Sequence, residues 1–81
     1  MAKREVWSVR WVSHDRLWHV ENGGRLIGRY LLKNNAVFAG AANARSRWND
    51  EEILAQLKVF NKNGRIAFER SYGKDPRRTK G

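Results

Sequence analysis

The stretch that decides the fold is VWSVRWVSHDRLWHVE, residues 6–21. Apolar and polar residues alternate in both of its halves, and this is the period of a β-strand with one buried face. With a turn at residues 14–15, Trp11 lies opposite Trp18. The two tryptophan-bearing faces then coincide, which predicts a β-hairpin.

A second turn follows at Asn22-Gly23-Gly24, because glycine readily adopts the positive φ of tight hairpins. It leads into a third strand over about residues 25–31. Two registers are open for this strand, since a two-residue turn sets Ile27 opposite Val20 and a three-residue turn sets Leu26 there.

Residues 34–48 change to a helical period. Asn34 or Asn35 is expected to cap the helix, and its alanines would let it lie close on a sheet. The acidic cluster that follows resembles a capping box, which predicts one further helical turn over residues 50–55. The stripe expected to pack on the sheet consists of Val37, Phe38, Ala41, Ala44, Arg45 and Trp48.

The C-terminal part contains Asn63-Gly64, the strongest short signal for a hairpin. A turn there sets Val59 opposite Phe68, and it sets Lys58 opposite Glu69 as a cross-strand ion pair.

These elements predict an α+β fold in the order βββαββ. We expect a two-layer sandwich with antiparallel hairpins and one main helix on one sheet face. Residues 1–73 form a single α+β domain in this interpretation, and residues 74–81 form a flexible basic C-terminal tail.

Composition excludes several classes of protein. The chain has no cysteine, so disulfides, thiolate metal sites and cysteine nucleophiles are excluded. No apolar run approaches the roughly 18 residues of a membrane span. Because residues 1–5 pass directly into a strand pattern rather than an apolar signal sequence, we expect a cytoplasmic protein with no membrane partner.

The charge of the chain is its strongest functional signal. Seventeen Lys and Arg oppose eight Asp and Glu, giving +9 over 81 residues. Most of the cations are arginines, whose planar guanidinium group donates paired hydrogen bonds to phosphates and carboxylates. This balance predicts a polyanionic partner, DNA or RNA in the first place.

Four segments resemble a small bacterial family of unknown function: Trp18-His19-Val20, Gly64-Arg65-Ile66, Ser71-Tyr72-Gly73-Lys74-Asp75-Pro76 and Lys80-Gly81. Members of that family run from a W-x-V hairpin through an alanine-rich helix to a G-x-I strand and an S-Y-G-x-D-P ending. The chain departs from the family at Lys33-Asn34, where a threonine-type cap is usual, and at residues 77–79, where further prolines are usual. The resemblance implies the architecture predicted above and no established activity.

No combination of residues predicts catalysis or a metal. His14, His19 and the adjacent Asp15 lack the third or fourth convergent ligand that a metal site needs, and we interpret His19 as a solvent-facing strand residue. Glu51 and Glu52 are adjacent and would diverge on a helix, so they cannot flank one bond. We therefore expect a protein that is not an enzyme, with no cofactor and no small-molecule substrate.

Basic residues near aromatic ones form the candidate binding site. Trp7, Trp11, Trp18 and Phe68 are expected in the core, while Tyr30, Phe60 and Tyr72 are the aromatics most free to be exposed. Contacts of this kind hold phosphates without sequence preference. The predicted nucleic-acid-binding residues are Arg65, Arg70, Tyr72, Lys74, Arg77, Arg78 and Lys80.

The alternative is a protein-interaction module, either a self-associating scaffold or an inhibitor that docks on an acidic partner surface. The sheet face away from the tryptophans is more apolar than a solvated face needs to be. Its predicted interface residues, for a homodimer or another protein, are Val6, Val12, Leu17 and Phe60.

Overall fold

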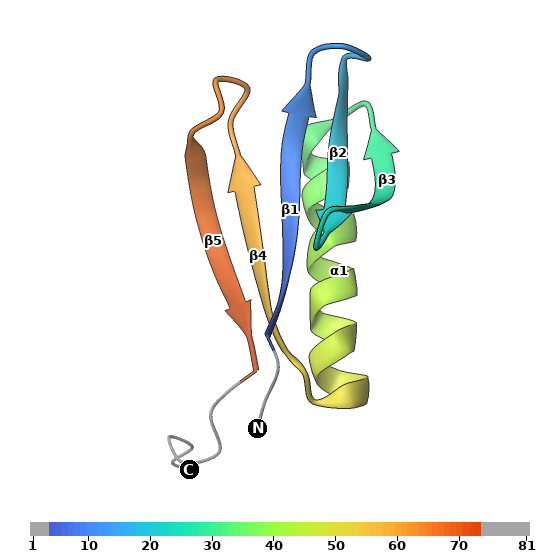
Figure 1. Ribbon diagram of the computed structural model, residues 1–81, viewed down its shortest axis with the longest axis vertical. Coiled ribbons are helices and arrows are strands. Elements are labelled where there is room, and N and C mark those ends of the chain that lie inside the picture. Colours follow the sequence, from blue (N-terminus) through green and yellow to red (C-terminus); the bar gives the residue numbers. More distant parts are fainter. Residues whose placement is uncertain (1–3, 74–81) are drawn as a thin grey trace.

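The computed structural model describes residues 4–73 (Figure 1). Its elements are β1 (Arg4–Val12), β2 (Leu17–Asn22), β3 (Arg25–Tyr30), α1 (Lys33–Glu51), β4 (Leu54–Phe60) and β5 (Ile66–Tyr72). The strands form one sheet in the order β3-β2-β1-β4-β5, and α1 packs on one of its faces. The predicted α+β class and order of elements are confirmed. The tail predicted over residues 74–81 lies outside the described residues.

Within residues 4–73, no helix combines the length and the apolar character that crossing a membrane requires.

Both predicted hairpins form with the predicted strand pairs, but the turn of the second spans residues 61–64 rather than Asn63-Gly64, and its register shifts between Val59 and Phe60. Trp11 pairs with Trp18, and Val59 pairs with Phe68. The two hairpins join through β1 and β4, which run parallel, so the sheet is mixed rather than purely antiparallel. The reason is visible in Figure 1: α1 returns the chain to the end of the sheet where β1 begins. Its 19 residues span about 28 Å, close to the length of β1.

The turn into β3 is the predicted two-residue alternative, because Asn22 pairs with Arg25, but Val20 does not pair with Ile27 as that alternative predicts. Val20 pairs with Gly28, and the next residue, Glu21, pairs with Leu26. Ile27 is therefore the extra residue of a β-bulge, which two regular turn lengths could not produce.

Both ends of α1 differ from the prediction. Leu32 takes the N-cap position without a side-chain hydrogen bond, so neither Asn34 nor Asn35 caps the helix. At its other end the helix continues unbroken through the acidic cluster, and Glu52 then terminates it with a left-handed φ of 54°. The separate turn predicted over residues 50–55 does not form.

The core combines large side chains from the sheet with small ones from α1. The helix buries Ala36, Gly40 and Ala44. A Cβ on Gly40 would lie 2.9 Å from Cδ1 of Leu57, so the helix approaches the sheet closely. The buried residues of this core are Trp7, Val9, Trp18, Val20, Ala36, Ala44, Ala55, Leu57 and Val59.

Close approach also decides which side of α1 is buried, and it corrects the predicted stripe. The small residues, spaced by four, face the sheet, and this turns Phe38 outward until 74% of it is exposed. Phe68, predicted in the core, is 36% exposed because it lies on the edge strand β5.

Candidate functional site

The edge strand β5 is left largely uncovered by α1. The outer strands of a five-stranded sheet lie about 19 Å apart, whereas a helix with its side chains is about 10 Å wide. The helix packs mainly over β1, β2 and β4, and every residue of β5 before Tyr72 is exposed. A single helix on this sheet therefore leaves open space along the side chains of β5 that face it.

That space is a groove of about 470 Å³ between α1 and β5. Phe38, Ala41 and Arg45 recur at helical spacing along one wall, and Arg70 and Tyr72 alternate along the other. The described residues that line it include no Asp or Glu. We define the α1–β5 groove by Asn34, Val37, Phe38, Ala41, Arg45, Arg70 and Tyr72.

The two arginines of the groove differ from the paired arginines of the fold. Arg45 and Arg70 form no hydrogen bond or ion pair with any of residues 4–73. In contrast, Arg47 donates from Nε and Nη2 to the two carboxylate oxygens of Glu5 at 2.9 and 3.0 Å, and from Nη1 to Glu51 at 2.8 Å. The hydrogen bonds to Glu5 raise the pKa of Arg47 above its ordinary value. Within residues 4–73, no side chain competes with a ligand for the guanidinium donors of Arg45 and Arg70.

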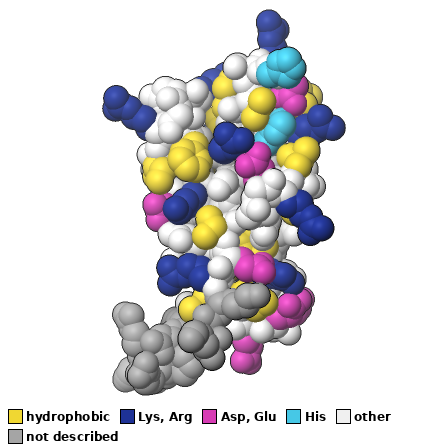
Figure 2. Space-filling view, in the orientation of Figure 1, with side chains coloured by type: hydrophobic (Ala, Val, Ile, Leu, Met, Phe, Trp, Pro, Cys, Tyr) yellow, Lys and Arg dark blue, Asp and Glu magenta, His cyan; other side chains and the backbone are white. Residues whose placement is uncertain are grey.

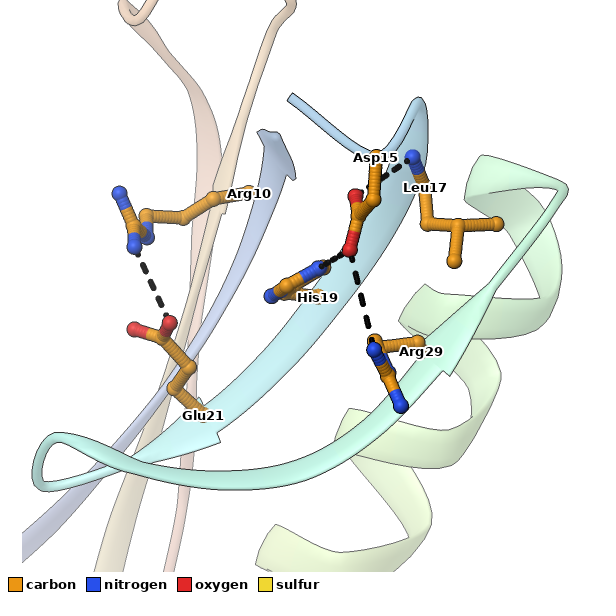
Figure 3. A network of polar contacts seen from close by, with 6 residues as sticks. All are labelled: Arg10, Asp15, Leu17, His19, Glu21 and Arg29. Carbon is orange, nitrogen blue, oxygen red and sulfur yellow. Dashed lines mark hydrogen bonds and ion pairs between the residues drawn. The ribbon is translucent and has the colours of Figure 1, made fainter. Parts of the chain in front are cut away.

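The opposite side of the sheet, which we call the open face, carries a network of partnered charges (Figure 3). Arg10 donates to Glu21 at 3.0 Å. Nε2 of His19 lies 2.8 Å from Oδ2 of Asp15, and Nη1 of Arg29 lies 3.9 Å from the same oxygen. The cations of this network already face carboxylates, Glu21 on β2 and Asp15 in the turn between β1 and β2.

Asp15 contacts both His19 and Arg29 in this network. Its hydrogen bond with His19 lowers the pKa of Asp15 below its ordinary value of 3.8, and partial desolvation opposes that effect. His19 lies on the open face of β2, where its side chain is 14% exposed. Its partner Asp15 holds it against the sheet.

The predicted interface residues lie on the open face. Val12 and Leu17 are paired neighbours, and each is half-buried. Val6 and Phe60 are also half-buried, on β1 and β4. Figure 2 shows this side of the molecule, with hydrophobic side chains distributed among basic and acidic ones.

The predicted nucleic-acid-binding residues are only partly brought together. Arg70 and Tyr72 line the α1–β5 groove. Arg65 precedes β5, about 17 Å from Arg70 along an extended strand, and does not line the groove. Four further predicted residues lie outside the described part of the chain: Lys74, Arg77, Arg78 and Lys80.

All five residues that α1 contributes to the groove were missed by sequence reasoning. Phe38 and Arg45 were assigned to the packed stripe of the helix, but they line the groove. The signal that could have found them is the spacing of Ala36, Gly40 and Ala44, which marks the closely packed side of α1.

The predicted cross-strand ion pair is also absent among residues 4–73. Lys58 and Glu69 are paired across the strands as expected, but Glu69 accepts a hydrogen bond from Nε2 of Gln56 at 2.7 Å. Among the same residues there is no group of three His, Cys, Asp or Glu side chains that could hold a metal ion.

No protein family, curated protein or solved structure matches this chain.

Proposed function

We propose that this protein is a non-enzymatic module that binds nucleic acid without sequence specificity through the α1–β5 groove. The observation that carries the proposal is the pair Arg45 and Arg70, which approach one groove from two elements without a carboxylate partner in residues 4–73. A guanidinium group donates two parallel hydrogen bonds to a phosphate. The net charge of +9 supplies long-range attraction for the same partner.

The basic residues that follow β5 in the chain belong to the same proposal. Because Tyr72 lines the groove, Lys74, Arg77, Arg78 and Lys80 follow a groove residue directly in sequence. We include them as further phosphate contacts, and Arg65 as a contact separate from the groove. Phosphate contacts give affinity but read no base edges, so the binding has no sequence preference.

A salt titration tests this function. Binding of DNA and RNA should weaken linearly in log-log form, with a slope of about −0.9 per phosphate contact on a duplex and about −0.7 on a single strand. The double variant Arg45→Gln with Arg70→Gln should reduce the slope by about 1.4 on single strands. Removal of residues 74–81 should reduce it further.

The matched control removes the same charge from the open face. Arg10→Gln with Arg29→Gln deletes two guanidinium groups that already face carboxylates. We expect this variant to keep most of the wild-type affinity. Equal losses from both double variants would show that only net charge matters, and no binding at about 50 mM salt would overturn the function itself.

A protein-interaction module is the second candidate, and one observation favours it. Leu31 and Leu32, adjacent in the loop between β3 and α1, are 77% and 62% exposed. Adjacent exposed leucines suit a contact with another protein. In this second function, they and the open-face residues predicted for a homodimer are the candidate contacts. Sedimentation distinguishes the two functions, because apolar association should persist at high salt whereas phosphate binding should not.

A further inference from the structure

The most exposed aromatic side chain among the described residues belongs to the α1–β5 groove. Phe38 is 74% exposed and lines the groove, although its position on α1 would accept a polar residue without loss of core packing. An exposed phenyl ring gains from a partner that offers an apolar or aromatic surface. Residues 4–73 supply none, so Phe38 points to a ligand.

The spacing along α1 shapes the space beside this ring. Phe38, Ala41 and Arg45 follow at i, i+3 and i+7, so they share one side of the helix. Phe38 and Arg45 are two turns apart, about 10 Å along the axis. Ala41 lies between them and has a short side chain. This wall therefore presents an aromatic ring and a guanidinium group with open space between them.

The wall formed by β5 repeats the same combination. Phe68, Arg70 and Tyr72 alternate onto the side of the strand that faces α1, opposite Val59, Leu57 and Ala55. The guanidinium carbon of Arg70 lies 5.4 Å from the ring centroid of Phe68. The α1 wall thus offers an aromatic ring two turns from Arg45, and the β5 wall offers one in contact with Arg70; neither arginine has an ion-pair partner in residues 4–73.

We infer that the α1–β5 groove binds single-stranded nucleic acid, with a base stacked on Phe38 and neighbouring phosphates held by Arg45 and Arg70. This inference rests on the proposed function and names its substrate class. In a duplex the base faces are stacked inside and cannot reach an exposed ring, whereas a single strand presents them. Every base has such a face, so stacking adds affinity without sequence preference. The groove volume of about 470 Å³ lies within the range of small-ligand sites and suits one or two nucleotides.

Three probes of equal length distinguish the contribution of base stacking from that of phosphate contacts. They are an oligothymidylate of about 12 nucleotides, the same oligomer with abasic sites throughout, and a duplex of that length. Measured by fluorescence anisotropy on the full chain, the oligothymidylate should bind most tightly and the abasic oligomer about tenfold more weakly. Phe38→Ala should weaken oligothymidylate binding about tenfold and leave abasic binding unchanged.

Leu31→Ala is the matched control, because Leu31 is 77% exposed and does not line the groove. It should leave all three affinities unchanged. The inference is overturned if the abasic oligomer binds as well as oligothymidylate, if Phe38→Ala has no effect, or if an oligoglutamate of equal charge competes equally. The proposed function can survive the first two of these results. Failure of all three probes to bind at low salt would instead overturn the function.

Discussion

Gly73 follows the last residue of β5 and lies against α1. A Cβ at this position would lie 2.5 Å from Cε3 and 2.7 Å from Cδ2 of Trp48, and 3.0 Å from Cδ2 of Leu54. Its φ is also positive, at 100°. Gly73→Ala therefore carries two costs: about 1 kcal/mol for the left-handed backbone and about 1–3 kcal/mol for overpacking against a rigid indole. The expected loss of unfolding free energy is about 2–4 kcal/mol.

Gly64 provides the matched control. Its φ is 88°, but no atom lies within 4 Å of the Cβ that would be added. Gly64→Ala should cost only the backbone share, about 1 kcal/mol. Urea unfolding followed by tryptophan fluorescence measures both variants, and the difference between them isolates the steric contact with Trp48.

A second background confirms the cause. When Trp48→Leu is present, the cost of Gly73→Ala should fall towards that of Gly64→Ala, because the closer contacts are gone and only the 3.0 Å contact with Leu54 remains. Equal losses for the two glycine variants in the wild-type background would refute this reasoning. The contact has a functional consequence, since it anchors the end of β5, and with it Tyr72, against α1.

Two further predictions concern the core and the open face. Leu57→Ala should lower the unfolding free energy by about 2–5 kcal/mol in urea, because Leu57 is fully buried under Gly40; a loss below about 1 kcal/mol would contradict this packing. The pKa of Asp15 is lowered in the folded protein. Its contribution to the free energy of unfolding is therefore complete above pH 3.8, the ordinary pKa, and is lost as the pH falls through the pKa of the folded state. Asp15→Asn should therefore destabilise the protein at about pH 6 and have little effect at about pH 2, and an equal effect at both would contradict the assigned pKa direction.

The two hairpins could be predicted because local patterns determine them. The tryptophan alternation sets the register of the first hairpin. In the second hairpin the turn spans residues 61–64, and a register shift between Val59 and Phe60 brings Val59 opposite Phe68. The bulge at Ile27 could not be predicted, because an extra residue shifts the register without breaking the alternation visible in sequence. The parallel pairing of β1 with β4 depends on the end of the sheet to which α1 returns the chain. No local sequence pattern predicts that end.

The candidate site was predictable on β5 but not on α1. Arg70 and Tyr72 follow from charge and alternation in the last strand, and both line the groove. For α1, hydrophobic size suggested that Phe38 packs inward. Packing instead selected Ala36, Gly40 and Ala44, because small residues let the helix backbone lie close to Leu57 and gain more contact overall.

The central claim is that nucleic acid binds in the α1–β5 groove. Amide chemical shifts of the isotopically labelled protein, followed while oligothymidylate is added, test it most directly. We expect the largest changes in the groove, at Phe38, Ala41, Arg45 and Arg70, and no change in the open-face network around Asp15. Changes confined to the open face, with the groove unperturbed, would contradict it.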